Sequence, residues 1–254
     1  MKAPDLFGLE GKKALVTGGS YGLGFAMARA LCEAGAEVGI VDISEKLEDA
    51  AKKLSAKNKK VTAIKADLSI RKSRKAAFDK FIKAFGTIDI LVNNAGITAR
   101  HPAEKFPIED WDKVLEVNLT AVFDLCQMAG NVMLRKGAGK IINVASLLSF
   151  TGGLTVPAYA ASKGGVAQLT KALSNEWASK GVNVNAIAPG YMDTPLNTAL
   201  IKDAVRSRQI LERIPAGRWG KPEDLMGAIV FLASQASDYM HGTILVVDGG
   251  FLGR

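Results

Sequence analysis

Short apolar runs rich in β-branched residues alternate along the chain with longer segments of helical periodicity. Seven of the short runs predict buried strands, over residues 13–18, 37–42, 61–67, 88–96, 140–146, 182–190 and 243–250. The segments between them predict helices near 22–35, 45–56, 69–85, 104–135, from 157, 203–213 and 221–233. Strands that alternate with helices are typical of βαβ units, which build a parallel sheet covered on both faces. The pattern predicts an α/β fold with a seven-stranded, doubly wound parallel sheet.

This alternation continues through the whole chain without a break. The sequence shows no fixed repeat, no low-complexity tract and no Pro/Gly/Ser-rich linker. With 254 residues and 48% apolar content, the chain is long enough for one sizeable core. We therefore expect a single domain over residues 1–254. The longest weakly patterned connection, residues 191–215, is a candidate lid.

Composition and charge narrow the classes of function. The net charge is +8, but the lysines are spread out, and the densest run, residues 52–60, contains no aromatic residue. A solvated helix end and loop explains this run better than nucleic-acid binding. Cys32, Cys126 and the two histidines lack metal or redox spacing, so we expect reduced thiols and no metal. Without a signal-like segment or a long apolar run, we expect a cytoplasmic protein with no membrane partner.

A glycine-rich loop follows the first predicted strand and leads into the first helix. It has the sequence TGGSYGLG, with Gly18, Gly22 and Gly24 in G-x-x-x-G-x-G spacing. Glycines let the backbone approach a pyrophosphate closely, and the helix N-terminus behind them presents free N–H groups. Glycine-rich turns also occur for packing, but the position directly after the first strand favours a dinucleotide site.

One acidic residue indicates which dinucleotide the site prefers. Asp42 ends the second predicted strand, 18 residues beyond Gly24. A carboxylate there can accept hydrogen bonds from the adenosine ribose and repel a 2′-phosphate. No Arg or Lys between Gly18 and Gly24 would neutralise that phosphate, although Lys46 could oppose this preference. We predict NAD rather than NADP, with a helix N-terminal cap as the other possible role of Asp42.

Several further motifs occur in one order along the chain. They are Asp67 after the third strand, NNAG at 93–96, Asn118 in EVNLTAVF, Ser146 in INVASLLS, YAASK at 159–163 and APGYMDT at 188–194. Together with the glycine loop, they resemble the short-chain dehydrogenase/reductase family from about residue 9 to the C-terminus. The resemblance implies a Rossmann-like domain whose catalytic residues are Asn118, Ser146, Tyr159 and Lys163.

The resemblance also implies roles for these four residues. Tyr159 would be the acid/base, although a tyrosine with its ordinary pKa near 10 is a poor base at neutral pH. Lys163, one helical turn away, would lower that pKa together with the positive charge of the nicotinamide, and it would hold the nicotinamide ribose. Ser146 would hydrogen-bond the reacting oxygen, and Asn118 would kink its helix around a water that links Lys163 to solvent. Taken singly, Ser146 and Asn118 would be cap or turn residues.

The dinucleotide site implied by the resemblance extends over many positions. Asp67 would meet the adenine amino group, and Asn93 would stabilise strand contacts. Thr194 would contact the nicotinamide carboxamide, with a helix cap as its alternative role. The predicted cofactor-binding residues are Gly18, Ser20, Tyr21, Gly22, Leu23, Gly24, Asp42, Asp67, Leu68, Asn94, Ala95, Gly96, Tyr159, Lys163, Pro189, Gly190 and Thr194.

Within the family, segments such as GKIINVASLLSFTGG and IPAGRWGKPEDLMG look most like dehydrogenases of sugar acids of the 2-deoxygluconate or 2-keto-3-deoxygluconate type. Arg100, just past NNAGI, is the preferred partner of the substrate carboxylate, beside Ser146 and Tyr159. The candidate lid adds a basic cluster of Lys202, Arg206 and Arg208. An NADP-dependent 3-oxoacyl reductase or another polyol or ketone reductase is the alternative enzyme. A non-catalytic dinucleotide sensor is disfavoured because Tyr159 and Lys163 are both present.

Two predicted helices are apolar on more than one side. Each therefore needs a second partner, unless long active-site loops of the same chain cover it. The residues concerned are Val166, Ala167, Leu169, Ala172, Leu173 and Trp177 in one helix and Val114, Leu115, Val117, Leu119, Ala121, Val122, Phe123, Leu125 and Met128 in the other. The resemblance suggests the same helix pair of another subunit and a further interface near the C-terminal strand, which predicts a homotetramer.

Overall fold

The computed structural model describes residues 2–55 and 61–254, and it contains one seven-stranded sheet. Every strand pair is parallel, in the order β3-β2-β1-β4-β5-β6-β7. The strands are β1 (Lys13–Thr17), β2 (Glu37–Asp42), β3 (Val61–Lys65), β4 (Ile90–Asn93), β5 (Gly139–Val144), β6 (Val182–Pro189) and β7 (Ile244–Val247). All seven predicted strands and the doubly wound order are confirmed.

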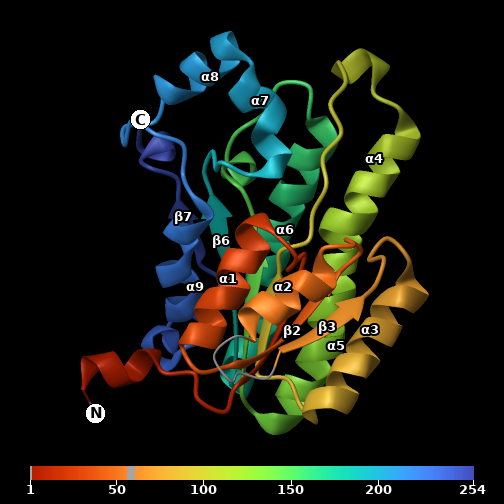
Figure 1. Ribbon diagram of the computed structural model, residues 1–254, viewed down its shortest axis with the longest axis vertical. Helices are drawn as coiled ribbons and strands as arrows, with labels where there is room; N and C mark the ends of the chain where they lie inside the picture. The colour runs from red at the N-terminus through yellow and green to blue at the C-terminus, as the bar shows by residue number, and fades with distance from the viewer. Residues whose placement is uncertain (1, 56–60) are drawn as a thin grey trace.

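Helices cover both faces of this sheet. They are α1 (Gly22–Glu33), α2 (Leu47–Leu54), α3 (Arg71–Phe85), α4 (Ile108–Leu115), α5 (Ala121–Lys136), α6 (Pro157–Trp177), α7 (Thr198–Lys202), α8 (Ala204–Leu211) and α9 (Met226–Ala233). Figure 1 shows α7 and α8 at the top, beyond the carboxyl ends of the strands. The lysine-rich run predicted as a helix end and loop lies partly outside the described residues, because 56–60 are not among them.

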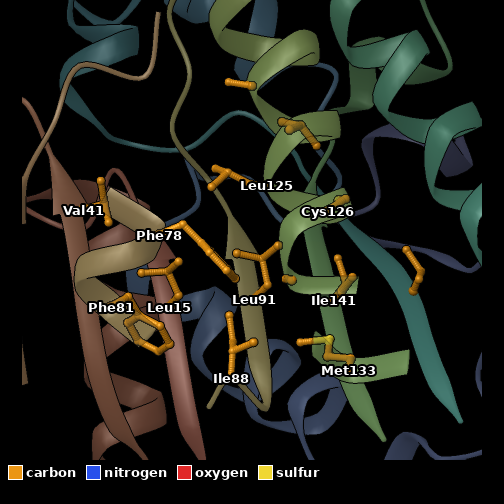
Figure 2. Close-up of a cluster of buried hydrophobic side chains, with 14 of the residues drawn as sticks. Leu15, Val41, Phe78, Phe81, Ile88, Leu91, Leu125, Cys126, Met133 and Ile141 are labelled. Atoms are coloured by element: carbon orange, nitrogen blue, oxygen red, sulfur yellow. The ribbon is translucent and has the colours of Figure 1, made fainter. Parts of the chain in front are cut away.

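Alternate residues of the strands enter two separate apolar layers. Leu15 joins Leu91 and Ile141 in the layer beneath α3, α5 and α6, whereas the next residue, Val16, faces α1, α2 and α9. Figure 2 shows the first layer, where Phe78 and Phe81 of α3 lie beside Leu15 and Leu91. This alternation is the period of two expected for a strand buried on both sides.

The predicted helix over 104–135 is interrupted at its middle. A π-turn over Glu116–Thr120 separates α4 from α5, and Asn118 lies inside it with no exposed surface. The helical stretch Ile108–Lys136 is longer than the apolar runs in the sequence suggested. It is long and apolar enough to span a membrane, with a mean hydropathy of 1.2 over an 18-residue window. Half of that window is buried in the protein, as in a core helix of a soluble fold. Its length is therefore weak evidence for a membrane.

Candidate active site

Two glycines of the loop after β1 are required by the packing of the chain itself. Gly18 has a φ of +65°, and a Cβ there would lie 2.8 Å from Asn94 Nδ2 and 3.0 Å from Ala95 Cα. A Cβ on Gly24 would lie 2.0 Å from the carbonyl oxygen of Gly18. Larger residues would push the loop away from the chain that follows β4. The loop is thus held against Asn94 and Ala95.

Gly22 leaves the N-terminal end of α1 open. Its φ is +58°, and a Cβ there would meet nothing nearer than Thr194 Cγ2 at 3.9 Å. α1 begins behind Tyr21, whose side chain makes no cap hydrogen bond. The first N–H groups of the helix, at Gly22 and Leu23, are therefore placed to meet an anion.

Thr17 joins the end of β1 to the NNAG loop. Its Oγ1 accepts from the N–H groups of Asn94 and Ala95, both at 3.0 Å, while Asn94 Nδ2 donates to the Thr17 carbonyl at 2.9 Å. A Cβ on Gly96 would come within 3.3 Å of Asn118 Oδ1. These predicted cofactor residues form one wall between the glycine loop and Asn118. At the end of β4, Asn93 Nδ2 donates to Asn143 Oδ1 at 2.9 Å, the kind of strand contact expected for it.

Asp42 lies at the end of β2 with its carboxylate directed at the glycine loop. It accepts from the N–H of Ser20 at 3.1 Å and from the N–H of Ser44 at 3.0 Å. Because α2 begins at Leu47 with Lys46 as its N-cap residue, the cap alternative for Asp42 is wrong. The Ser20 hydroxyl is buried beside this carboxylate with no hydrogen-bond partner. An unpaired hydroxyl next to a carboxylate and an open helix N-terminus fits the ribose and phosphates of a dinucleotide.

The loop after β3 is fixed where the adenine was expected. The Asp67 carboxylate accepts from the hydroxyl of Ser69 at 2.7 Å and from its N–H at 2.8 Å. These hydrogen bonds hold the pKa of Asp67 below its ordinary value. The Leu68 carbonyl accepts from Nη1 of the buried Arg74 at 2.7 Å.

The end of β6 brings the third part of the predicted cofactor site beside the first. The N–H of Gly190, just after Pro189, donates to the Val247 carbonyl at 2.9 Å, and a Cβ on Gly190 would lie 2.6 Å from Asp248 Cα. Thr194 is the nearest neighbour of Gly22. Thr194 occupies the N-cap position of the short helix Pro195–Asn197, as the cap alternative predicted, but its side chain makes no cap hydrogen bond there.

Ser146, Tyr159 and Lys163 meet at the carboxyl end of β5. Ser146 accepts from the Leu148 N–H at 3.1 Å and caps a short turn there. Pro157 starts α6, and Lys163 Nζ lies 5.7 Å from the centroid of the Tyr159 ring. The lysine is 3% exposed and donates to the Val144 carbonyl at 2.6 Å. Residues far apart in sequence thus form the predicted hydroxyl, phenol and amine group.

Asn118 links this group to the NNAG loop. Its Oδ1 accepts from the Ile97 N–H at 2.8 Å, and its Nδ2 donates to the Ile97 carbonyl at 2.9 Å and to Ser162 Oγ at 3.1 Å. The surrounding π-turn is the kink that was predicted at this position. Such turns are rare and are frequent at functional sites.

These elements line a cleft that is open to solvent and has a cavity volume of about 90 Å³, smaller than the ~300–1,000 Å³ of typical small-molecule sites. The predicted substrate residues Arg100, Ser146 and Tyr159 all line it. Of the basic cluster in the lid, only Arg206 lines it, because Lys202 and Arg208 face elsewhere. The lining residues are Thr98, Arg100, Ser146, Leu147, Leu148, Gly153, Leu154, Val156, Tyr159, Gly190, Tyr191, Leu196, Asn197, Leu200 and Arg206.

Comparison with known proteins assigns the family. A family model described as enoyl-(acyl carrier protein) reductase matches residues 18–252. The 2-dehydro-3-deoxy-D-gluconate 5-dehydrogenase of Pseudoalteromonas atlantica is 53% identical over 253 residues, which cover 98% of this chain and 99% of that protein. The chain belongs to the short-chain dehydrogenase/reductase family. It is therefore a member of a family of nicotinamide-dependent oxidoreductases.

Two solved members of the short-chain dehydrogenase/reductase family superpose closely. A proposed 2-deoxy-D-gluconate 3-dehydrogenase of Agrobacterium tumefaciens, with bound NADP, is 51% identical with a TM-score of 0.92 and covers 98% of this chain and 100% of its own. A gluconate 5-dehydrogenase of Burkholderia cenocepacia, in complex with NADP and tartrate, is 42% identical with a TM-score of 0.95 and full coverage of both chains. Both contain NADP, the dinucleotide that the sequence disfavoured here.

The electrostatics of Tyr159 differ from the expectation. Burial raises the pKa of its hydroxyl above 10, and a hydrogen bond with Ser146 and the charge of Arg100 offset this only in part. Burial also lowers the pKa of Lys163 to about 8. The predicted depression of the Tyr159 pKa relied on two positive charges, those of Lys163 and of the nicotinamide, and Lys163 alone does not produce it. Desolvation of the phenolate outweighs a neighbouring amine that is itself desolvated.

Sequence reasoning missed most of the walls of the cleft. Leu154 and Val156 come from the loop before α6, and Tyr191, Leu196 and Leu200 come from the segment after β6. Their apolar character alone does not distinguish them from core residues. Thr98 was missed although it stands between the NNAG loop and Arg100, and its buried Oγ1 has no hydrogen-bond partner. Proximity to a recognised motif was the signal available for it.

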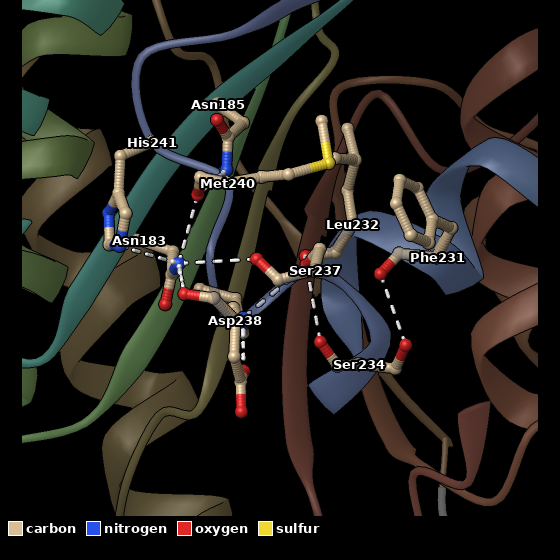
Figure 3. A network of polar contacts seen from close by, with 10 residues as sticks. Asn183, Asn185, Phe231, Leu232, Ser234, Ser237, Asp238, Met240 and His241 are labelled. Atoms are coloured by element: carbon tan, nitrogen blue, oxygen red, sulfur yellow. Dashed lines mark hydrogen bonds and ion pairs between the residues drawn. The ribbon is translucent and has the colours of Figure 1, made fainter. Parts of the chain in front are cut away.

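A second cavity lies at the amino ends of the strands, away from these family residues. Lys140 Nζ pairs there with Asp238 at 2.7 Å, and Lys136 pairs with Asp89. Asn183 Nδ2 donates to the carbonyls of Met240 at 2.9 Å and Asp238 at 3.0 Å (Figure 3). These groups hold the segment before β7 against β6. Their interactions within the fold account for the polar residues of this cavity.

Proposed function

We propose that this protein interconverts a secondary alcohol and a ketone on a sugar acid, with NAD as its cofactor. The observation that carries the proposal is that Arg100, Ser146 and Tyr159 line one cleft, with Lys163 Nζ 5.7 Å from the centroid of the Tyr159 ring. Relatives named for 2-dehydro-3-deoxy-D-gluconate and gluconate support this substrate class. The proposed substrates are therefore of the 2-deoxygluconate or 2-keto-3-deoxygluconate type.

In the proposed mechanism, the Ser146 hydroxyl hydrogen-bonds the reacting oxygen of the substrate and orients it toward Tyr159. NAD, held by the glycine loop and Asp42, would supply the acceptor for the hydride of the alcohol carbon. Tyr159 takes the proton of the substrate hydroxyl, and in the reverse direction it returns this proton to the ketone oxygen. Lys163 holds the ribose hydroxyls and, when charged, favours the phenolate form of Tyr159. Asn118 joins the π-turn to the segment after the NNAG loop through Ile97 and to α6 through Ser162.

The proposed carboxylate partner is Arg100. It makes no ion pair with any acidic residue that the structure describes, and its charge acts on the Tyr159 hydroxyl. A planar guanidinium binds a carboxylate through two parallel hydrogen bonds. Arg100 would thereby place the carbon chain of the substrate with its hydroxyl at Ser146 and Tyr159.

The preference for NAD is part of the proposal and rests on Asp42. Its buried carboxylate lies beside Ser20, where a 2′-phosphate would bring like charge. NADP is the second candidate, because both solved relatives described above contain it.

The activity is tested by measuring reduction of NAD and NADP with a panel of sugar acids, polyols and 3-hydroxyacyl thioesters. We expect sugar acids to be oxidised best, and Tyr159→Phe to lower kcat by ~100-fold or more while NAD still binds. Preferential turnover of 3-hydroxyacyl thioesters would instead establish the acyl reductase alternative. Residual activity of the variant above about a tenth of wild type would show that Tyr159 is not the acid/base.

We also propose that the protein is a cytoplasmic homotetramer. Within the chain, one side of the helical stretch Ile108–Lys136 is only half-buried, at Leu115, Val117, Leu119 and Met128. Phe123 on the same stretch is 40% exposed. At the edge of the sheet, Val246 of β7 is 37% exposed. Two apolar surfaces on different sides suit two interfaces. Sedimentation at micromolar concentration tests this: a mass of one chain contradicts it, and a mass of two leaves one interface.

A further inference from the structure

We propose that Arg206 forms a second anion subsite in the cleft, so that the enzyme accepts sugar acids with a negative group at both ends. The inference rests on the proposed function and names the substrate class of the same site. The shared chemistry of the second group is an anionic oxygen cluster, which a carboxylate or a phosphate can supply.

The charge of the cleft is the first observation. Its lining contains Arg100 and Arg206 but neither Asp nor Glu. Among the residues that the structure describes, neither arginine forms an ion pair with an acid; Arg206 Nη1 donates to Gln209 Oε1 at 2.8 Å and its other guanidinium N–H groups make no hydrogen bond. Several arginines elsewhere in the protein have carboxylate partners, as Arg218 has in Asp224 at 2.6 Å, although Arg213 lies over the Phe251 ring instead. Two guanidinium groups without acids in one cleft fit an anionic ligand better than an internal ion pair.

The packing of α8 directs Arg206 into the cleft. Ile210, 4% exposed, packs with Leu147 in a small apolar cluster next to Ser146. Arg206 precedes Ile210 by four residues and therefore lies on the same helical face, whereas Arg208 lies on another face and pairs with Glu212. This explains why only Arg206 of the lid cluster lines the cleft.

An aromatic cluster holds α8 in this position. Trp219 Nε1 donates to Ser207 Oγ at 3.3 Å, and the Trp219 ring packs edge-on against Tyr191 with centroids 5.6 Å apart. Tyr191 also packs against Phe251 at 5.3 Å. The helix α8 is therefore held beyond the carboxyl ends of the strands (Figure 1), and Arg206 lines the cleft from it.

The two arginines reach the cleft from different elements. Arg100 comes from the loop after β4 and acts on the Tyr159 hydroxyl, and Arg206 comes from the segment after β6. A substrate with one carboxylate compensates the positive charge of one arginine and leaves the charge of the other without a counter-charge. A substrate with anionic groups at both ends compensates both, with its reacting hydroxyl between them at Ser146.

The test compares three six-carbon acids: D-gluconate, D-glucarate with a second carboxylate, and 6-phosphogluconate with a phosphate. We expect the wild-type kcat/KM to be highest for one of the two dianions, and the one preferred identifies the second group. Arg206→Gln should lower the ratio of kcat/KM for that dianion to that for gluconate by about tenfold or more. Arg208→Gln, on the same helix but outside the cleft, should leave the ratio unchanged.

Two results would overturn the inference. One is a wild-type preference for gluconate over both dianions. The other is an equal loss on gluconate and on the dianion in Arg206→Gln, which would mean that both arginines hold one carboxylate. If the wild type oxidises no sugar acid, the proposed function fails, and calorimetric binding of glucarate and 6-phosphogluconate to wild type and Arg206→Gln then decides the subsite alone.

Discussion

The two ends of the parallel sheet use polar residues in opposite ways. At the amino ends, Lys140 and Lys136 have acidic partners, and the amide of Asn183 is bound to the backbone of the segment before β7. At the carboxyl ends, Arg100 and Arg206 have no acids beside them, and the Ser20 hydroxyl is buried without a partner. The lining of the larger cavity at the amino ends includes both acids and bases, whereas the cleft contains only bases.

This difference shows that the size of a cavity or the number of its charges does not locate a site. What distinguishes the carboxyl ends is that polar groups there are buried or gathered without being satisfied by the chain itself. Satisfied groups stabilise the fold, and unsatisfied ones are available to a ligand. Substitutions at the amino ends should therefore lower the stability of the fold, and substitutions at the carboxyl ends should lower activity.

The largest effect is expected for Lys163→Met at the carboxyl ends. Loss of the amine that faces Tyr159 should lower kcat by ~100-fold or more. Lys171→Met, an exposed lysine on the same helix, is the control and should keep full activity. The measurement is initial rate under saturating cofactor and substrate, with circular dichroism to verify folding. More than about a tenth of the wild-type rate would place Lys163 outside the proposed mechanism.

A stability effect is expected from Asn183→Leu at the amino ends. The substitution leaves the Asp238 carbonyl without its donor, whereas the Ser237 carbonyl keeps the Met240 N–H and the Met240 carbonyl keeps Asn185. The loss should cost ~1–3 kcal/mol of unfolding free energy. Urea titration measures this, and kcat/KM of the folded protein should stay within about twofold. Gln235→Ala, exposed in the same region, is the matched control. A loss of turnover without a loss of stability would contradict the assignment of this end to structure.

A smaller, selective effect is expected from Asp42→Asn. This substitution keeps the shape and one hydrogen-bond acceptor for Ser20 or Ser44 but removes the charge that would face a 2′-phosphate. The ratio of kcat/KM with NADP to that with NAD should rise by about tenfold. A wild-type enzyme that already uses NADP better than NAD would show that this carboxylate does not select the cofactor.

The smallest effect is a pH dependence of stability that Lys163 introduces at the carboxyl ends. Its pKa is about 8 in the folded protein and 10.5 ordinarily, so the unfolded chain binds more protons between these values. Unfolding free energy should therefore rise with pH through this window, by about 1 kcal/mol from pH 7 to pH 9. Urea titrations without cofactor should show this rise, and Lys163→Met should remove it. An unchanged slope in the variant would assign the dependence to other groups.

The fold and the identity of the candidate site were predictable because they depend on local patterns. Strand and helix periods predicted all seven strands and the place of the glycine loop, whereas Ser146, Tyr159 and Lys163 were predicted from the resemblance to the short-chain dehydrogenase/reductase family. Their position near the glycine loop follows from parallel strands sharing a carboxyl edge.

Features that depend on distant contacts were not predictable in the same way. Which of Lys202, Arg206 and Arg208 lines the cleft follows from the packing of Ile210 on Leu147. These two residues are 63 positions apart, and the sequence does not reveal that they are in contact. The effect of burial on Tyr159 was not predictable either, because helical spacing reveals the neighbouring charge of Lys163 but not the loss of water that raises the pKa of the phenol.

The strand order also sets the sequence of events in which this site can form. β1 lies between β2 and β4 in the sheet; it pairs with β2 first and must wait about 70 residues of synthesis for β4. From β4 onward, each new strand adds to the growing edge, so β7 arrives last and only then supplies the Val247 carbonyl to Gly190. Because chains fold from the N-terminus as they emerge, the glycine loop and its NNAG wall should assemble on the ribosome before α6 exists. A nascent chain therefore acquires its dinucleotide half first and its substrate half at release.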